Sequence, residues 1–265
     1  MWVAFRGGVV ARCSLPLQDP PLLAAPFLSR EPTMPNLNGM HSAASALRYY
    51  ERKQEVVANN LANVSTNGFK AQRVFATLLD GIAPAAQAGT DFNVGALRQT
   101  GNATDVAIDG QGFFVVSTPN GERYTRGGSL RLDENHHLVD NDGRPLLGTK
   151  GGPLKLLDAP IEIDAKGQVK QNGQIVDTLR IETAPKGTDV QREGETLWMP
   201  PANKEILKPA DRNVKQGYIE ESNVNSMTAL IDMVSVQRAY ASVQKSIIEM
   251  DHTNETVATQ IARPL

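Results

Sequence analysis

Few residues in this 265-residue chain could carry chemistry, and each also fits a structural role. Asp105 and Asp109 are close enough in sequence to suggest a general acid and general base pair. Both stand at strand-edge or turn positions, where aspartate bonds the backbone, so the turn interpretation is the stronger. The adjacent His136 and His137, within DENHH, would point to opposite faces of a strand and could not readily share one metal ion.

Other candidate motifs also lack the partners that catalysis or ligand binding would need. The stretch GQGFF leads into an expected strand rather than a helix, so it does not form a phosphate cradle. His41 and His252 are isolated on expected helices, and the single cysteine, Cys13, excludes an internal disulfide framework and a cysteine metal cluster. No serine has a nucleophile-elbow context. We therefore expect no enzyme, no metal site and no cofactor.

The charge balance and apolar content narrow the class of protein further. The 27 Lys and Arg residues nearly balance the 29 Asp and Glu residues, which argues against a general nucleic-acid-binding protein. No apolar run approaches the ~20 residues needed to span a bilayer, so no membrane insertion is expected. Residues 1–33 are proline-rich and make a poor signal peptide, because Arg12 interrupts the apolar run. We expect a non-native or disordered extension there, with translation starting at Met34.

The stretch VANNLANVSTNGFKAQRVF, residues 57–75, places four asparagines at the end of an expected helix: Asn59, Asn60, Asn63 and Asn67. Asparagine is a mediocre helix former because its amide competes for backbone hydrogen bonds. Asn67 and Gly68 supply a permissive backbone where the helix must stop. A frayed, solvent-facing helix end would leave Asn59 and Asn60 without a role. We expect their amides to bond a neighbouring helix or loop.

Long amphipathic helices are expected at both ends of the chain. Residues 225–261 contain no proline or glycine, and steps of three and four give an apolar seam over about four heptads, which indicates a coiled coil. Its members are Met233, Val236, Tyr240, Val243, Ile247, Met250, Asn254, Val257 and Ile261. The N-terminal seam comprises Met40, Ala43, Leu47, Tyr50, Gln54, Val57, Leu61 and Val64. The two seams could pair with each other or with other copies.

Between the helices, short apolar runs alternate with Asp/Asn–Gly turns about every 10 residues, which indicates antiparallel β-hairpins. The turns are expected at 109–112, 120–121, 133–136, 141–143, 164–167 and 172–173. The predicted fold is α+β: a discontinuous long-helix coiled-coil domain from the two chain ends, with an inserted antiparallel β-rich domain. The expected boundaries are 34–70 plus 213–265 for the helices, 71–98 for an extended linker and 99–212 for the β domain.

Three blocks in order carry a family resemblance. ANNLANVSTNGFKAQRVF, DVAIDGQGFFVV…YTRGGSLRLDENHHLVDNDGRPLLG and VKQGYIEESNVNSMTALIDMVSVQRAYASVQKSIIEMD resemble the bacterial flagellar basal-body rod protein family. Together they cover most of residues 34–265. The short 70–105 stretch makes the chain most like the proximal rod protein and next most like the distal rod protein.

The resemblance implies a structural, non-enzymatic subunit that polymerises into the tubular drive shaft, transmitting torque from motor to hook. Implied partners are other copies, other flagellar rod and hook proteins and the flagellar type III export apparatus, with no cleaved signal peptide. The implied location is the periplasm-spanning rod of the basal body. Expected subunit-interaction residues are Asn59, Asn60, Leu61, Asn63, Thr66, Gly68, Phe69, Gly217, Glu220, Ser222, Asn223 and Val224.

Two alternatives remain open from the residues. One is a distal rod or hook-type subunit of the same family. The other is a trimeric β-sandwich surface-binding module, whose ligand groove would need exposed aromatic side chains. The aromatic residues available to it are Phe92, Phe113, Phe114, Tyr124 and Trp198.

Overall fold

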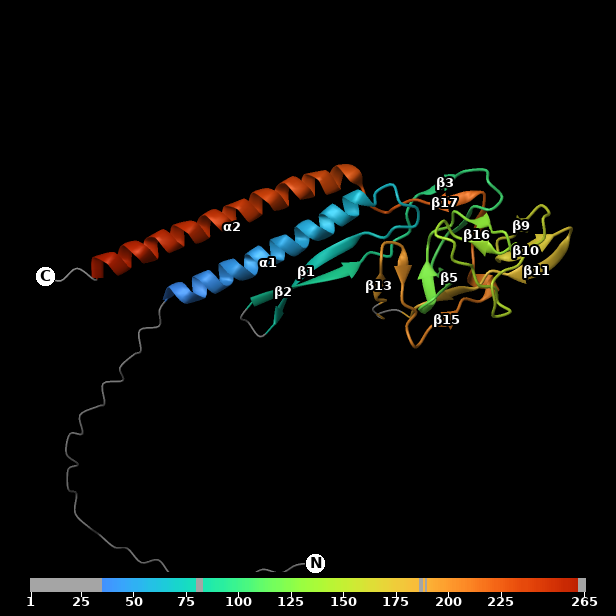
Figure 1. Ribbon diagram of the computed structural model, residues 1–265, viewed down its shortest axis with the longest axis horizontal. Helices are drawn as coiled ribbons and strands as arrows, with labels where there is room; N and C mark the ends of the chain where they lie inside the picture. The colour runs from blue at the N-terminus through green and yellow to red at the C-terminus, as the bar shows by residue number, and fades with distance from the viewer. Residues whose placement is uncertain (1–34, 80–82, 186–187, 189, 262–265) are drawn as a thin grey trace, which may run out of the picture. The chain divides into compact units, whose positions relative to one another are not determined.

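A computed structural model describes residues 35–79, 83–185, 188 and 190–261 of the chain. The expectations for residues 1–33, the start at Met34 and the single Cys13 lie outside these residues. The described part is α+β, as the sequence predicts, with one long helix at each end and antiparallel strands between them (Figure 1). None of the described helices has the combination of length and hydropathy required to cross a membrane.

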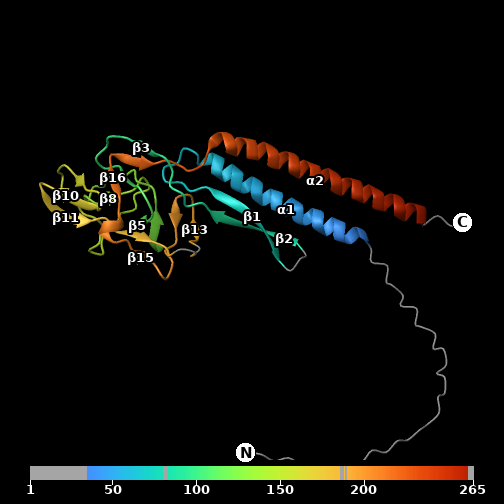
Figure 2. The ribbon, with the colours of Figure 1, turned by 180° about the vertical axis from the view of Figure 1, so that it is seen from behind.

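The two helices, α1 (Pro35–Ala62) and α2 (Ser226–Ile261), run side by side in both views (Figures 1 and 2). They are antiparallel: the Tyr240 hydroxyl lies 3.2 Å from the Glu51 carboxylate, and the Asn254 amide lies 3.9 Å from the Met40 sulfur. An isolated helix gains most of its stability from such tertiary packing. The pairing of the two seams as a coiled coil stays a prediction, and most of the described seam positions are buried or half-buried.

Seam positions on α2 are buried or half-buried at Met233, Val236, Tyr240, Val243, Ile247 and Met250. On α1 the same holds for Met40, Leu47, Val57 and Leu61. Val257 is the exception, because 48% of it is exposed near the end of α2. Tyr240 of α2 lies opposite Glu51 of α1, and the helices run in opposite directions. Val257 is 17 residues past Tyr240, but α1 extends only 16 residues before Glu51, so Val257 lies beyond the end of α1.

An antiparallel hairpin follows α1, formed by β1 (Gln72–Leu79) and β2 (Ala83–Thr90). Its register runs from Gln72 opposite Thr90 to Leu79 opposite Ala83. The expected extended linker at 71–98 is therefore corrected to a hairpin followed by a short strand, β3 (Leu97–Gln99). The alanine-rich composition of β2, which suggests a loop by strand propensity, is overridden by pairing with the more apolar β1.

The β domain contains a six-stranded antiparallel sheet in the order β13-β14-β6-β5-β12-β15. Its strands are β5 (Phe113–Thr118), β6 (Gly121–Thr125), β12 (Ile181–Thr183), β13 (Arg192–Glu193), β14 (Leu197–Trp198) and β15 (Glu205–Ile206). A three-stranded sheet joins β9 (Glu162–Ile163), β10 (Gln168–Gln171) and β11 (Gln174–Thr178). A short 3-10 helix, Pro209–Asp211, follows β15.

Three smaller pairings complete the described strands. β4 (Val106–Ile108) pairs with β16 (Val214–Gln216), β3 with β17 (Tyr218–Glu220), and β7 (Arg131–Leu132) with β8 (Leu138–Val139). The turn at 109–112 therefore joins strands of two different sheets rather than closing a hairpin. The β3–β17 and β4–β16 pairs tie the return segment before α2 to the start of the β domain.

Two apolar clusters form the core of this domain. The larger one includes Val106, Phe114, Leu138, Leu179 and Ile181, all nearly inaccessible to solvent. The second surrounds Trp198 and contains Phe113, Val115, Tyr124, Leu147 and Val190. Most of the aromatic side chains that a surface-binding module would expose are thus used for packing instead.

Aspartate-initiated turns recur at three places in the β domain. The Oδ1 atoms of Asp133, Asp140 and Asp164 each accept the backbone N–H groups two and four residues later, at distances of 2.7–3.0 Å. The residue three positions after each aspartate has positive φ, and it is His136 in the first turn and glycine in the other two. The sequence predicts the turns at 133–136 and 164–167 correctly, whereas the turn predicted at 141–143 begins one residue earlier, at Asp140. At 120–121 it errs by one position, because Thr118 pairs with Gly121.

Gly143 tests how much the positive φ contributes. Its φ is +82°, whereas Gly152 has an ordinary backbone, and an added Cβ at either position meets nothing within 4 Å. We expect Gly143→Ala to lower the free energy of unfolding by about 1–2 kcal/mol through backbone strain alone. Gly152→Ala should be neutral or stabilise by up to about 1 kcal/mol. Equilibrium unfolding in urea measures both, and equal effects would contradict the strain argument.

Candidate functional site

The two stretches that carry the expected interaction residues meet where α1 ends and α2 begins. We call this region the junction, and it comprises residues 59–71 and 217–224. The Gly68 N–H donates to the Glu220 carbonyl at 2.7 Å, and the Asn223 N–H donates to the Phe69 carbonyl at 3.4 Å. Segments about 150 residues apart in the chain are thus joined by their backbones.

Asn60 pairs with the backbone of β1 in the way that a neighbouring strand would. Its Oδ1 accepts the Gln72 N–H at 2.9 Å, and its Nδ2 donates to the Gln72 carbonyl at 2.8 Å. The amide is 9% exposed, so these bonds are shielded from water. The sequence predicts a bond from this amide to a neighbouring helix or loop, whereas the partner is strand β1 of the same chain.

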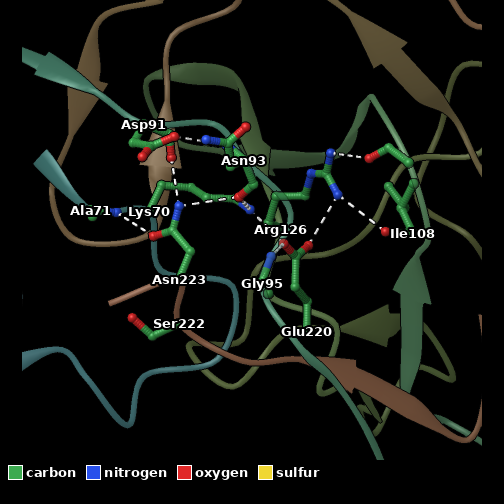
Figure 3. Close-up of polar contacts among 12 residues, drawn as sticks. Lys70, Ala71, Asp91, Asn93, Gly95, Ile108, Arg126, Glu220, Ser222 and Asn223 are labelled. Carbon is green, nitrogen blue, oxygen red and sulfur yellow. Dashed lines mark hydrogen bonds and ion pairs between the residues drawn. The ribbon is translucent and has the colours of Figure 1, made fainter. Parts of the chain in front are cut away.

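Asn223 anchors the base of the same hairpin from the other side. Its Oδ1 accepts the Ala71 N–H at 2.7 Å, while its Nδ2 donates to the carbonyls of Asp91 and Asn93 at 2.8 and 3.1 Å (Figure 3). A side-chain amide has one acceptor and two donors of this kind, and all three are used here. Asn60 and Asn223 together fix where the hairpin leaves the helices.

The end of α1 is closed by other members of the asparagine stretch. Asn63 donates from Nδ2 to the Asn59 carbonyl at 3.0 Å and accepts the Thr66 hydroxyl at 3.0 Å. These bonds satisfy polar groups that every helix C-terminus leaves unpaired. Asn59 itself is exposed, and its side chain forms no hydrogen bond with the residues that the structure describes.

Gly68 and Phe69 place the backbone of the junction directly against the β domain. Gly68 has φ of +72°, and a Cβ there would lie 2.4 Å from the Arg126 carbonyl carbon. No other residue fits this conformation and approach. Phe69 is fully buried, and the Arg192 guanidinium lies 4.4 Å from its ring centroid.

A buried ionic cluster lies at the centre of the junction and consists of Lys70, Arg126 and Glu220 (Figure 3). Glu220 Oε1 lies 2.5 Å from Lys70 Nζ, and its Oε2 lies 3.0 Å from Arg126 Nη1. The Gly95 N–H also donates to Glu220 Oε1 at 2.9 Å. One carboxylate therefore links the end of the α1 segment, the β domain and the strand before α2.

Burial lowers the pKa of the Lys70 ammonium below its ordinary value, and the Glu220 carboxylate opposes that effect. Burial lowers the pKa of Arg126 in the same way, again opposed by Glu220. Two buried cations share one buried carboxylate, so removing that carboxylate leaves both without a counter-charge. Arg126 also donates to the carbonyls of Ile108 and Gly110, which fixes its guanidinium.

Sequence reasoning identifies Glu220 but misses Lys70 and Arg126. A lysine and an arginine are ordinarily exposed, and nothing in their local sequence indicates that both become buried. The adjacency of Lys70 to Gly68 and Phe69 was the available signal.

The remaining expected residues lie around the same region. Gly217 donates to the Asp105 carbonyl at 2.8 Å, and Ser222 Oγ accepts the Val224 N–H at 3.3 Å. Leu61 and Val224 are half-buried.

Asp105 and Asp109, considered above as an acid and base pair, are held by different groups. Asn102 donates to Asp105 at 3.1 Å, whereas Lys215 pairs with Asp109 at 2.8 Å. His136 lies in an exposed turn. Within the described ranges, no group of three or more histidine, cysteine or acidic residues could hold a metal ion.

Asn60→Asp tests the strand-like role of the amide. The substitution keeps an acceptor for the Gln72 N–H but replaces the donor with a carboxylate that faces the Gln72 carbonyl. We expect a loss of about 1–3 kcal/mol in the free energy of unfolding, measured by urea titration, because the Gln72 carbonyl loses its donor. Asn59→Asp places the same charge one residue earlier on an exposed site and should cost much less. Equal losses would contradict the proposed bonds.

Glu220→Gln tests the ionic cluster. The amide leaves Lys70 and Arg126 without their shared charge, so we expect a loss of about 3–5 kcal/mol in the free energy of unfolding. The matched control is Glu221→Gln, because Glu221 forms an exposed pair with Arg98 at 2.8 Å, which contributes at most about 1 kcal/mol. Denaturant titration of the full chain measures both. A Glu220→Gln variant as stable as the control would show that the buried charges have little effect.

Family models match the chain in three consecutive parts. The Flagella basal body rod protein model matches residues 40–70, the Flagellar hook protein FlgE/F/G D1 domain matches residues 107–195, and the Flagellar basal body rod FlgEFG protein C-terminal model matches residues 215–261. The first and third matches contain most of the two helices and nearly all of the junction. The second covers most of the β domain.

Several curated proteins are similar over most of the chain. The flagellar basal-body rod protein FlgF of Rhizobium meliloti is 33% identical over 216 residues, which cover 77% of this chain and 90% of the relative. FlgF of Mesorhizobium japonicum is 32% identical over 214 residues, covering 77% and 89%. The rod protein FlgG of Buchnera aphidicola subsp. Schizaphis graminum is 34% identical over 235 residues, covering 74% and 89%. The chain belongs to the flagellar basal-body rod protein family.

Proposed function

We propose that the chain is a structural subunit of the bacterial flagellar basal-body rod, which polymerises into the tubular drive shaft between motor and hook. The names of its relatives support a structural rather than an enzymatic role. The proposed partners are other copies, other rod and hook proteins and the flagellar type III export apparatus. The short 70–105 stretch favours the proximal-rod type, and the distal-rod type is the alternative, since the relatives include FlgF and FlgG proteins at 32–34% identity.

An exposed apolar surface on α2 supports the part of the proposal that concerns assembly with other subunits. The helix has a second apolar stripe at its start, away from the seam, and more than 45% of each member is exposed. These residues are Met227, Leu230, Ile231 and Val234. Burying such a side chain stabilises by about 1.5–3 kcal/mol, so a stripe of four supports a stable contact with a neighbouring subunit. We propose that this stripe and the exposed Asn59 face other subunits.

The junction residues have a different role in the proposal. Because the polar groups of Asn60, Asn63, Glu220 and Asn223 are already bonded within the chain, they position the helices instead of contacting a neighbour. The proposed packing is a coiled coil of α1 and α2 within each subunit, with successive subunits joined head to tail. A heterologous contact of this kind does not close, so the assembly grows as a filament.

Assembly must also wait until export is complete. We propose that the terminal helices are unfolded during export, without a cleaved signal peptide, and that their ends far from the junction take up fixed positions only on docking into the periplasm-spanning rod. The alternative surface-binding module has little support. Phe113, Phe114, Tyr124 and Trp198 are at most 6% exposed, and a ligand groove would need such rings at the surface.

Ile231→Asp tests the exposed stripe. Because 60% of Ile231 is exposed in the single chain, the substitution should leave the unfolding of the monomer unchanged. Incorporation into rods should fall at least about tenfold, since the lost apolar burial exceeds 1.4 kcal/mol. The matched control is Gln237→Asp, at an exposed polar position of the same helix. Rods isolated from cells and swimming speed measure incorporation, and normal rods with Ile231→Asp would refute the proposed contact.

A further inference from the structure

The β1–β2 hairpin has open backbone edges on both sides. Among the described strands, β1 and β2 pair only with each other. The Gln72 N–H and carbonyl point away from β2, because both bond to Asn60. Backbone groups of antiparallel strands alternate in direction, so those of Val74 and Ala76 point the same way. An isolated two-stranded hairpin is at best marginally stable in water.

A groove runs beside the open edge of β1. It has a volume of about 420 Å³, and its walls include Val57 of α1, Val74 of β1, and Thr228 and Ala229 of α2. Asn60 also lines the groove, and its bonds to Gln72 replace those that the first residue of a third strand would make. Val74, whose N–H and carbonyl are the next to point away from β2, is another lining residue, and Lys53, Arg73 and Asp232 add charge to the wall. The groove therefore leaves room for an extended segment to pair with the unpaired edge of β1.

The opposite edge of the hairpin suits this groove. Ala86 and Ala88 lie opposite Ala76 and Val74, so their backbone groups also point outward, away from β1. The strand from Ala83 to Thr90 has no charged residue and mostly small side chains. Proteins normally protect exposed strand edges with charges or proline. On the outward edge of β2 only Pro84, near its start, does so, and the positions from Ala86 to Thr90 carry neither. A strand of small, uncharged residues is the kind that enters a narrow groove.

We propose that the open edge of β1 in one copy accepts the open edge of β2 in a second copy of the chain. Both edges belong to the same hairpin, so the contact is heterologous and repeats from copy to copy. Copies stacked in one orientation place β2 of the next subunit antiparallel to β1 of the first, which extends a continuous antiparallel sheet. The inference rests on the proposed function, because it requires copies that stack head to tail.

The test removes the outward N–H groups of β2 without disturbing the hairpin. Proline at positions 86 and 88 removes two backbone N–H groups that point away from β1. Pro84 already occupies an alternate position of this strand whose backbone points the same way. In the full chain, Ala86→Pro combined with Ala88→Pro should leave the unfolding of the monomer unchanged. Two lost backbone hydrogen bonds should weaken incorporation into rods about tenfold or more. Ala86→Ser combined with Ala88→Ser keeps both N–H groups and is the matched control.

Hydrogen exchange provides the second measurement. The Val74 amide should exchange freely in the monomer and become protected in rods assembled from the unsubstituted chain. Incorporation of the double-proline chain at the normal level, or rapid Val74 exchange in assembled rods, would overturn the strand pairing while leaving the rod function intact. If the unsubstituted chain itself does not enter rods, the proposed function fails instead.

Discussion

The arrangement of the whole chain depends on the buried carboxylate of Glu220. Glu220 follows the β domain and precedes α2, and it holds Lys70 from the other end of the insertion and Arg126 from within it. Its desolvation is offset only because both oxygens are occupied. The Gly68–Glu220 backbone bond then brings the end of α1 to the start of α2. The carboxylate and this backbone bond hold the two ends of the insertion together, while Asn60 and Asn223 fix where the hairpin leaves the helices.

Side-chain amides bind the hairpin to the junction in a similar way. The amides of Asn60 and Asn223 bond backbone groups at the base of the β1–β2 hairpin, as a neighbouring strand would, so these groups are paired with protein instead of water. This explains why asparagine stands at position 60, where helix propensity disfavours it. The residue type at positions 60 and 223 is set by hydrogen-bond geometry across the junction.

Periodicity was sufficient to predict the two helices α1 and α2, because one buried face requires a regular spacing of apolar residues. Turn chemistry was sufficient for Asp133 and Asp164, since each turn is stabilised by its own aspartate. The β1–β2 hairpin was missed because its strands depend on each other and on Asn60, which local propensity does not register. The burial of Lys70 and Arg126 was missed for the same reason: it is created by residues 150 and 94 positions away.

The short distance between the two ends of the insertion has a consequence for how the family can diversify. A 2.7 Å backbone bond between Gly68 and Glu220 means that the chain leaves the helical pair and returns to it at nearly one point. The entropy of closing a loop grows only slowly with its length. Parts of this segment that do not contact Glu220 can therefore change in length or shape without moving the helices, provided that Lys70, Gly95 and Arg126 keep their bonds to the carboxylate.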